Sequence, residues 1–511
     1  MAGTRTLRNV FTVGALTSLS RVLGLAREML QSRFIGAGVE QSAFTLAFAI
    51  PNMARKLFGE GALTAAFVPV FKGEVEREGV EKAAKLARAV ITMMMLMVGA
   101  IVVLALTGVL VAGSVTVLPE KAYRYGITLE LVAILLPYML AICGAAFGMG
   151  VLNALGKFKA SSFMPALLNV VWIAALGTVS FFPGLSVHHR IVIIASAILA
   201  GGFAQMAFMF RCMAKVGVSP WPLFAGWKNE NVRLVWRNTG IAAVGAGAVQ
   251  INYLLDQVLG QLAAPWAAGV IGYAERLMDL PLGVIGVAFG TVLLPTFSGL
   301  FAKSDMEGAR AALSSSVCNL MFVMVPSAVG LFVLAPEVTS VIYEGNAFDA
   351  QATVRVSRAL AVYALGLGFF GYQKSIIPWF QAQHDMKTPL RVSVQMVVLN
   401  AVLNIAAVFG LPVEWRHVGL AASTVLCAGV GAVVLTVHAR RKNGTLGLWM
   451  IAGTLAKIAA AAALMGMAVW AAKIGLAGMN KVVALGIEII VGMVCYAALA
   501  LCFRLQFRRK L

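Results

Sequence analysis

The sequence predicts an all-α polytopic membrane protein of about fourteen transmembrane helices, and three observations support this fold class. Of the 511 residues, 60% are hydrophobic and only 12% are charged, with a mean hydropathy of +0.88. A soluble globular domain carries about 25% charged residues. Apolar runs of about 20 residues, long enough to span a bilayer as helices, recur along the chain. No other stretch is long and polar enough to form a separate soluble domain.

These runs define the candidate spans in order. They lie near residues 10–32, 39–57, 89–113, 128–152, 162–182, 191–213, 238–262, 267–300, 313–334, 357–381, 390–411, 418–438, 450–472 and 482–503. The span near 267–300 is long and contains Pro281 and Pro295, so we expect it to kink or to end in a cytoplasmic extension. The charged stretch 72–88 is expected to form a solvated helix along the inner surface.

The distribution of Lys and Arg between the loops predicts the orientation. Basic residues concentrate in every second loop, and the loops between them hold few. Cytoplasmic loops carry this excess in membrane proteins. Both termini are therefore expected in the cytoplasm, which requires an even number of spans.

Several function classes are excluded by what the sequence lacks. The net charge of +20 could indicate nucleic acid, but the basic residues sit mostly in short loops between apolar runs. The six cysteines are scattered singly, and the five histidines have no metal-ligand spacing. The GxGxxG match at residues 366–371 lies within an apolar run and has no preceding strand, and there is no Walker A lysine loop. We expect neither enzymatic activity nor a bound cofactor.

A weak internal repeat at an offset of about 226 to 230 residues organises the chain into lobes. Residues 42–51 resemble residues 272–281, and residues 152–159 resemble residues 380–387. Because six spans separate the copies, the repeats are parallel, as in transporters whose halves rock about a central site. We expect an N-lobe at 1–215, a cytoplasmic linker at 216–235, a C-lobe at 236–440, and a terminal helix pair with a basic tail at 441–511. The two six-helix lobes would surround a central cavity.

The first span carries charges that a lipid-facing helix would not tolerate. On a helix, its polar residues fall on one face, namely Thr17, Ser20, Arg21, Gly24, Arg27, Glu28 and Gln31. One Arg at the centre of a bilayer costs about 2.5 to 3.5 kcal/mol on insertion scales. Two of them on one span therefore indicate a water-accessible cavity, which would attract an anion.

Further charges could complete such a site. Glu275 and Arg276 lie at the repeat position in the C-lobe, so we expect arginines of both lobes to face the central line between them. Arginine donates bidentate hydrogen bonds to phosphate. The alternative is that these residues form ion pairs that only fix helix packing. Arg55, together with its neighbour Lys56, could bind substrate or signal topology, and Lys374 could face the cavity or reach an interface.

A second kind of site is predicted from oxygen-bearing side chains in the later spans. Asp256 lies in the seventh span, Asn400 and Asn404 are spaced i, i+4 in the eleventh, and Thr424 lies in the twelfth. Carboxylate and carbonyl oxygens are ligands of hard cations, so a Na+ or proton site is one interpretation. Interhelical hydrogen bonding is the other.

Several motifs together resemble one family. They are SRVLGLARE at residues 20–28, PNMARKLFGEGA at 51–62 and YAERLMDLP at 273–281, with shorter matches at 34–38, 67–69, 294–295 and 385–389. The sequence resembles the MurJ (MviN) lipid II flippases of bacterial cell-wall synthesis over nearly its whole length. The resemblance implies the fold of the multidrug/oligosaccharidyl-lipid/polysaccharide (MOP) exporter superfamily, and a terminal helix pair that helps form a groove for the lipid tail. It also implies that Arg21, Arg27, Glu28, Arg55 and Arg276 line a cationic cavity. Ser42 departs from the family, which often has Asp there, and Glu40 is the nearest substitute.

The resemblance implies a function and its partners. We expect a multi-pass protein of the bacterial cytoplasmic membrane that moves an undecaprenyl-diphosphate-linked glycopeptide lipid from the inner to the outer leaflet by alternating access. The membrane potential could drive the movement, with Na+ or H+ coupling as a further source, and the family's sodium site corresponds to Asp256, Asn400, Asn404 and Thr424. We expect a monomer, associated with cell-wall synthesis proteins.

Three alternatives stay open. A flippase for another polyprenyl-linked glycan would share the fold and the cationic cavity. A cation-coupled drug exporter would need an acidic or aromatic cavity instead. A scaffold that recruits other factors through residues 72–88 would tolerate mutations in the cavity.

Overall fold

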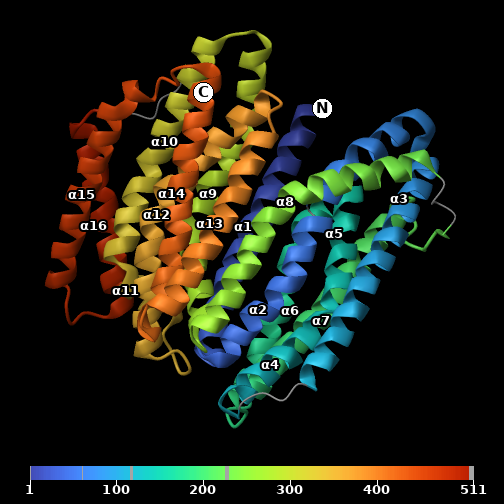
Figure 1. The fold of residues 1–511 in the computed structure, drawn as a ribbon, viewed down its shortest axis with the longest axis horizontal. Helices are drawn as coiled ribbons and strands as arrows, with labels where there is room; N and C mark the ends of the chain where they lie inside the picture. Colours follow the sequence, from blue (N-terminus) through green and yellow to red (C-terminus); the bar gives the residue numbers. More distant parts are fainter. Residues whose placement is uncertain (1, 60, 115–118, 225–228, 506–511) are drawn as a thin grey trace. The chain divides into compact units, whose positions relative to one another are not determined.

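A computed structural model of the chain describes residues 2–59, 61–114, 119–224 and 229–505. Across these residues every regular element is a helix, as Figure 1 shows. Within the same ranges ten helical segments are long and apolar enough to cross a membrane, and the first of them, Val39–Gly113, runs over more than one helix. The predicted all-α membrane fold is confirmed. The number of fourteen spans stays a prediction.

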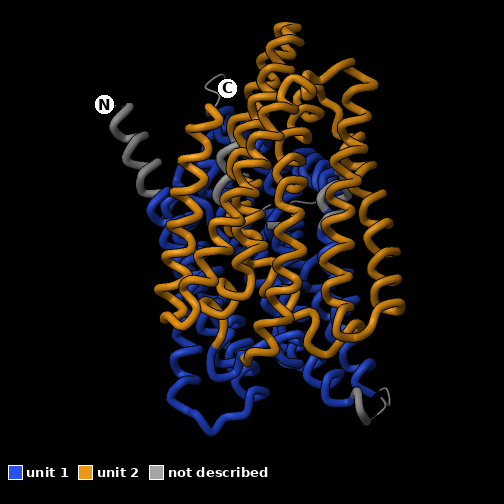
Figure 2. Tube along the Cα trace, turned by 90° about the vertical axis from the view of Figure 1, so that its left-hand side faces the viewer, with its two compact units in different colours: residues 1–261, 345–348 blue, residues 262–344, 349–511 orange. Residues whose placement is uncertain are grey.

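The chain forms two compact units, which Figure 2 distinguishes by colour. Unit 1 comprises Met1–Gln261 and Gly345–Phe348, and unit 2 comprises Leu262–Glu344 and Asp349–Leu511. The lobe boundaries expected from the repeat, at residues 215, 236 and 440, stay a prediction. Residues 225–228 of the expected linker and residues 506–511 of the expected basic tail lie outside the described residues.

Unit 1 is built from long apolar helices that pack in pairs. Its elements are α1 (Ala2–Ile35), α2 (Val39–Ala54), a π-helical turn (Arg55–Gly59), α3 (Ala62–Gly113), α4 (Pro119–Leu135), α5 (Tyr138–Ala154), α6 (Phe158–Ser180), α7 (Val187–Lys215) and most of α8 (Glu230–Ala263). The closest pairs are α1 with α6, α5 with α7, α6 with α7 and α2 with α4. The pairing of α1 with α6 places the polar face of the first span against a second helix.

Two breaks shape the region between the first spans. The π-helical turn joins α2 to α3, and Gly79 interrupts α3 with a positive φ of 82°. Glycine adopts this conformation without the steric penalty of a Cβ atom. The stretch 72–88 is helical on both sides of Gly79, so the helix expected there forms with a break in its middle.

Unit 2 contains the later helices. They are α9 (Ala267–Ala302), α10 (Met306–Val333), α11 (Ala335–Tyr343), α12 (Ala350–Ala382), α13 (Lys387–Gly410), α14 (Val413–Asn443), a short 3-10 helix (Leu448–Ile451), α15 (Ala452–Gly475) and α16 (Lys481–Cys502). Helix α12 packs on α9, α10 and α14, while α15 packs on α10 and α16. The 36 residues of α9 extend over about 54 Å, more than the ~30 Å hydrocarbon core, which agrees with the expected extension.

Close helix approach depends on small residues. A Cβ atom at Gly202 of α7 would overlap the ring of Tyr138 on α5, and one at Gly36 would overlap the carbonyl oxygen of Ala347. Gly36 also has a φ of 78°, which other residues rarely adopt. In lipid, where the hydrophobic effect does not drive helices together, such close contact is a main source of association.

The repeated segments 152–159 and 380–387 form turns of the same geometry. In the first, Gly156 has a φ of 71° and the amide of Lys157 donates to the carbonyl of Leu152 at 2.8 Å. In the second, His384 has a φ of 57° and the amide of Asp385 donates to the carbonyl of Phe380 at 3.0 Å. Both turns are C-terminal caps that end one helix before the next begins. The sequence repeat therefore corresponds to a repeated local structure.

Candidate functional site

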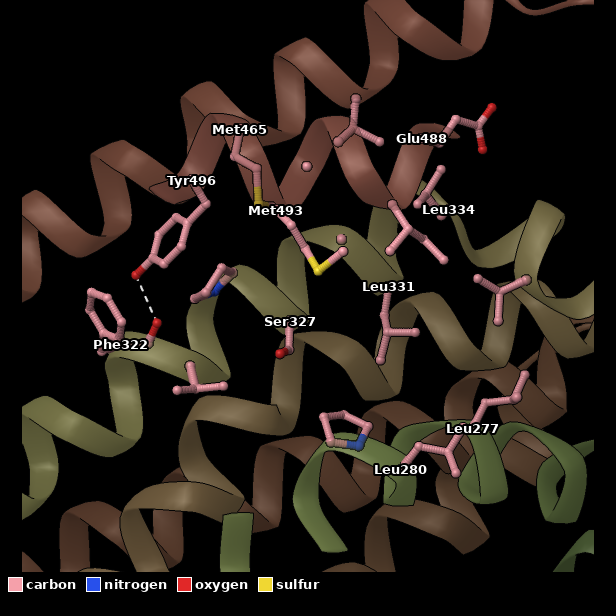
Figure 3. A pocket seen from close by; sticks show the side chains of 18 residues that line it. Leu277, Leu280, Phe322, Ser327, Leu331, Leu334, Met465, Glu488, Met493 and Tyr496 are labelled. Carbon is pink, nitrogen blue, oxygen red and sulfur yellow. Dashed lines mark hydrogen bonds between the residues drawn. The ribbon is translucent and has the colours of Figure 1, made fainter. Parts of the chain in front are cut away.

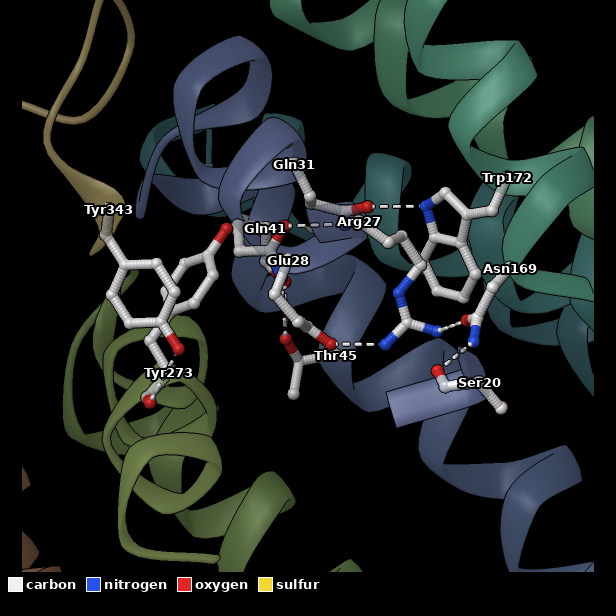
Figure 4. A network of polar contacts seen from close by, with 10 residues as sticks. All are labelled: Ser20, Arg27, Glu28, Gln31, Gln41, Thr45, Asn169, Trp172, Tyr273 and Tyr343. Carbon is white, nitrogen blue, oxygen red and sulfur yellow. Dashed lines mark hydrogen bonds and ion pairs between the residues drawn. The ribbon is translucent and has the colours of Figure 1, made fainter. Parts of the chain in front are cut away.

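Arg27 is held at the centre of a polar network within unit 1 (Figure 4). Its Nη1 donates to Oδ1 of Asn169 on α6 at 3.0 Å, and its Nη2 pairs with Oε1 of Glu28. The guanidinium also lies over the ring of Trp172, 4.2 Å from the ring centroid. The Asn169 amide in turn donates to the backbone oxygen of Ser20 at 3.0 Å. Four groups from α1 and α6 thus fix one arginine.

The network continues from Trp172 through two glutamines. The indole Nε1 of Trp172 donates to Oε1 of Gln31 at 2.7 Å, and Nε2 of Gln31 donates to Oε1 of Gln41 at 3.0 Å. Gln31, Gln41 and Trp172 are buried. Because these bonds connect α1, α2 and α6, they define the rotation of α1 and with it the direction in which Arg27 extends.

The chemistry available to Arg27 follows from its exposure and its remaining donors. Its side chain is 14% exposed and that of Glu28 is 17% exposed, so both are within reach of a ligand. A guanidinium carries five N–H donors, of which Asn169 and Glu28 use one each. Of the remaining three, the Nε donor is buried, and an anion could bind the two that are left on the Nη atoms. The arrangement also serves helix packing, so both interpretations made from the sequence retain support.

The other predicted residues of unit 1 are distributed along its helices. Arg21 is exposed on α1. Arg55 begins the π-helical turn, and its Nε donates to Oδ1 of Asn52 at 3.3 Å. The ammonium of Lys56 lies 5.4 Å from the ring centroid of Tyr253 on α8. The π turn therefore sets the positions of both basic residues.

In unit 2, the predicted substrate residues lie on α9 and α12. Glu275 accepts a hydrogen bond from the hydroxyl of Tyr363 at 3.3 Å. Its neighbour Arg276 is exposed, as is Lys374 on α12. One turn before Arg276, the backbone oxygen of Tyr273 accepts from the hydroxyl of Tyr343 at 3.3 Å (Figure 4). Helix α9 thus has Glu275 bound to α12 and Arg276 accessible.

Three of the four predicted cation ligands lie together in unit 2. Nδ2 of Asn404 donates to Oδ1 of Asn400 at 2.8 Å, and Nδ2 of Asn400 lies 3.4 Å from Oγ1 of Thr424 on α14. The fourth, Asp256, belongs to unit 1, is buried, and accepts from Asn252 at 3.2 Å. The bond between α13 and α14 supports the interhelical interpretation. A cation site at these residues stays a prediction.

Unit 2 also contains an apolar cavity of about 560 Å³. It is lined by residues of α9, α10, α15 and α16, together with Leu334 and with Val338 of α11, and among its described lining residues Ser327, Glu488 and Tyr496 are the only polar side chains. Figure 3 shows Met465 and Met493 beside this space, with Tyr496 and Glu488 at opposite ends of it. An apolar channel formed with the terminal helix pair is what the resemblance implies for a lipid tail.

Two ion pairs lie near this cavity and form what we call its charged rim: Glu337 precedes Val338, and Lys473 follows Val469 by one turn, and both of those neighbours line the cavity. Lys473 at the end of α15 pairs with Glu337 of α11 at 2.7 Å, and Lys481 at the start of α16 pairs with Glu344 at 3.0 Å. Hydrogen bonds from Ser340 and from Lys481 lower the pKa of Glu344 below its ordinary value of 4.5. The cavity therefore leads from an apolar interior to a charged rim.

Sequence reasoning missed several of these residues. Asn169 and Trp172 stand three apart in the sixth helix, and a polar and an indole side chain on one face of an apolar span are a signal for a helix contact. Glu488 is the one acidic residue in its span. A lone carboxylate there indicates a functional position.

Comparison with known proteins identifies the family. A family profile described as Lipid II flippase MurJ matches residues 31–491. The chain belongs to the MurJ family of lipid II flippases. A probable lipid II flippase MurJ of Rhizobium tropici is 30% identical over 505 residues, which cover 97% of this chain and 93% of the relative. A lipid II flippase MurJ of Burkholderia cenocepacia is 31% identical over 445 residues, covering 85% of this chain and 84% of the relative.

Solved structures show the same fold. A structure described as lipid II flippase MurJ in an inward closed conformation matches with a TM-score of 0.77 at 23% identity, covering 96% of this chain and 98% of that one. An inward-facing multidrug resistance transporter of the MATE family in the MOP superfamily matches with a TM-score of 0.70 at 14% identity, over 85% and 98% of the two chains. Membership of the MurJ family, expected from the motifs, is confirmed, and the chain shares the fold of both solved structures.

Proposed function

We propose that this protein transports lipid II, the polyprenyl-diphosphate-linked peptidoglycan precursor, from the inner to the outer leaflet of the cytoplasmic membrane by alternating access. The observation that carries the proposal is the fixed guanidinium of Arg27 on the first helix, in a chain of the MurJ family. A charge is retained inside a membrane protein where it has a function. A planar fork of donors matches the geometry of phosphate oxygens, and a diphosphate presents several of them.

The remaining predicted residues have defined roles in this proposal. Arg21, Arg27 and Arg55 are the cations that bind the diphosphate and its sugars in unit 1, and Arg276 and Lys374 are those that bind them in unit 2. Glu28 and Glu275 hold the donors in place and prevent the anion from binding too tightly to be released. The apolar cavity beside α15 and α16 receives the polyprenyl tail, because it offers few polar side chains to an isoprenoid chain.

The drive that we propose is the membrane potential. An inside-negative potential favours outward movement of an anion by about 2.3 kcal/mol per charge per 100 mV. A Na+ or H+ gradient is the second source, with Asp256, Asn400, Asn404 and Thr424 as ligands. Proteoliposomes with an imposed K+ diffusion potential separate the two, because replacing Na+ or removing the pH gradient leaves a potential-driven rate unchanged.

The orientation is part of the proposal. The loops rich in Lys and Arg face the cytoplasm, and so do both termini. Cysteine labelling from either side of sealed vesicles tests this, for example with a cysteine introduced at exposed Lys303 against one introduced at exposed Lys481. The first should react only from the cytoplasmic side and the second only from the outer side.

The site is tested by removing one charge from each unit. Arg27→Gln and Arg276→Gln should each lower the rate of lipid II transport in proteoliposomes by about 100-fold, since a bidentate charged contact is lost. The matched controls are Arg211→Gln on α7 and Arg391→Gln on α13, which remove exposed arginines outside the proposed site. If both site variants transport lipid II at the wild-type rate, the site assignment is wrong.

The identity of the cargo is tested separately. Depletion of the protein in its own cell should cause lipid II to accumulate in the inner leaflet. Accumulation of a different polyprenyl-linked glycan, with peptidoglycan synthesis intact, would identify the protein as a flippase of the other class.

A further inference from the structure

The charged rim of the apolar cavity has acceptors without donors. Glu488 on α16 is 2% exposed, and its Oε2 has no hydrogen-bond partner. On α11, Oε1 of Glu337 pairs with Lys473, but its Oε2 is buried and also has no partner. A buried carboxylate oxygen without a donor is costly, so two of them indicate a group that brings donors of its own.

The two lysines of the same rim have N–H donors beyond those used in their ion pairs. An ammonium carries three N–H donors. The Lys473 ammonium contacts Glu337, which leaves two donors, and the Lys481 ammonium contacts Ser340 and Glu344, which leaves one. A ligand that fits this rim therefore presents both a donor-rich cation and an anionic acceptor.

The positions along the helices show how such a ligand would lie. On α15, Val469 lines the cavity and Lys473 follows one turn later, at the helix end. On α16, Lys481 begins the helix, and Glu488 and Tyr496 both line the cavity (Figure 3). The cavity thus extends away from the lysines, and the eight helical steps from Glu488 to Tyr496 span about 12 Å, close to the ~15 Å hydrocarbon depth of one leaflet.

We propose that this rim binds a phospholipid whose headgroup carries a primary ammonium, such as phosphatidylethanolamine. The ammonium donates to the unpartnered oxygens of Glu488 and Glu337, the phosphate accepts from Lys473 and Lys481, and one acyl chain enters the cavity. The occupant is a lipid of the bilayer itself, and the polyprenyl tail of lipid II would displace its acyl chain from the cavity during transport. The proposal goes beyond lipid II transport, and its test is made without lipid II.

The headgroup chemistry distinguishes this lipid from others. A choline headgroup has the same charges but no N–H donors, so it leaves both carboxylate oxygens unpaired. A glycerol headgroup keeps the phosphate but has no cation to place beside two carboxylates, and like charges then repel. Recognition should follow the number of N–H donors on the headgroup nitrogen.

The experiment measures lipid retention by the full-length protein with native mass spectrometry. The purified protein is titrated in detergent with phosphatidylethanolamine, its N-methylated derivatives, phosphatidylcholine and phosphatidylglycerol of matched acyl chains. The wild-type protein should retain phosphatidylethanolamine about tenfold more tightly than phosphatidylcholine. Glu488→Gln should remove this preference and leave the binding of phosphatidylcholine unchanged.

The matched control is Glu414→Gln, which neutralises an exposed glutamate at the start of α14, outside the rim. It should keep the wild-type preference. Equal retention of the ethanolamine and choline lipids by the wild-type protein overturns the proposal, and so does tight binding of phosphatidylglycerol. The series of headgroups is measured on the wild-type protein, so it tests the proposal even if the Glu488 variant does not fold.

Discussion

Replacing Asn169 by leucine tests whether the arginine network of unit 1 stabilises the fold as well as orienting Arg27. Asn169 is 7% exposed and makes two hydrogen bonds, accepting from Nη1 of Arg27 at 3.0 Å and donating to the backbone oxygen of Ser20 at 3.0 Å. Leucine has the same branching and the same number of side-chain heavy atoms but no polar atoms, so Asn169→Leu removes both bonds without opening a cavity.

The magnitude follows from the two partners that are left. An abandoned hydrogen bond to a charged group costs about 1.5–3 kcal/mol, and the lost bond to the half-buried carbonyl of Ser20, which lies within α1, costs about 0.5–1.5 kcal/mol, so the sum is about 2–4.5 kcal/mol. Arg27 keeps its contacts with Glu28 and Trp172, and its side chain is 14% exposed, so water replaces part of the loss. We expect the free energy of unfolding to fall by about 2–3 kcal/mol.

The assay is denaturant unfolding of the purified protein in detergent, with lipid II transport measured on the same preparation. Asn169→Asp keeps an acceptor for Arg27 and should transport faster than Asn169→Leu. The control is Thr178→Val, which removes an exposed hydroxyl bonded only to the carbonyl of Ala174 in the same helix. An unfolding free energy for Asn169→Leu within about 0.5 kcal/mol of wild type would refute the reasoning, since surface changes alone produce that much.

Three further predictions concern packing, acid stability and the aromatic partner of Arg27. Gly202→Ala should destabilise the protein by about 1–3 kcal/mol because the new methyl group meets the ring of Tyr138, whereas Gly177→Ala, with open space at its Cβ, should be neutral or slightly stabilising in thermal denaturation. The pKa of Glu344 is lowered in the folded protein, so its ionised form stabilises the fold above the ordinary pKa of 4.5, and this stabilisation is lost as the pH falls below that value. Glu344→Gln should therefore flatten the acid side of a profile of melting temperature between pH 3 and pH 6. An unchanged profile contradicts this. Trp172→Leu removes both the aromatic ring under Arg27 and the hydrogen-bond donor to Gln31, whereas Trp172→Phe removes only the donor. Transport rate and stability should therefore fall from wild type to Trp172→Phe and again to Trp172→Leu. An equal loss in both variants would exclude a role for the ring.

The helical membrane fold was predictable because it depends on composition and on runs of apolar residues, which are local properties. The turns at Gly156 and His384 were likewise visible as a repeat, since a helix cap is specified by a few adjacent residues. The break at Gly79 was not predicted, because a glycine within a charged helical stretch is compatible with an unbroken helix.

The candidate site divides in the same way. The polar face of the first span identified Arg27 and Glu28, since the helical period alone brings those residues together. It did not identify Asn169, which is 142 residues away in the sequence and meets Arg27 only because α1 and α6 pack at one particular rotation. Glu488 was missed for a different reason, since a single carboxylate acquires meaning only when its surroundings show that it has no partner.

The π-helical turn Arg55–Gly59 holds one residue more than an α-helical turn of the same height. If α2 took up that extra residue, it would shift by about 1.5 Å along its axis and rotate by about 100°, and its backbone hydrogen bonds would be kept. A step of this kind would carry the guanidinium of Arg55 from one side of its helix to another. The extra residue of the π-helical turn next to Arg55 would therefore let this cation face a different surface while the neighbouring helices stay folded.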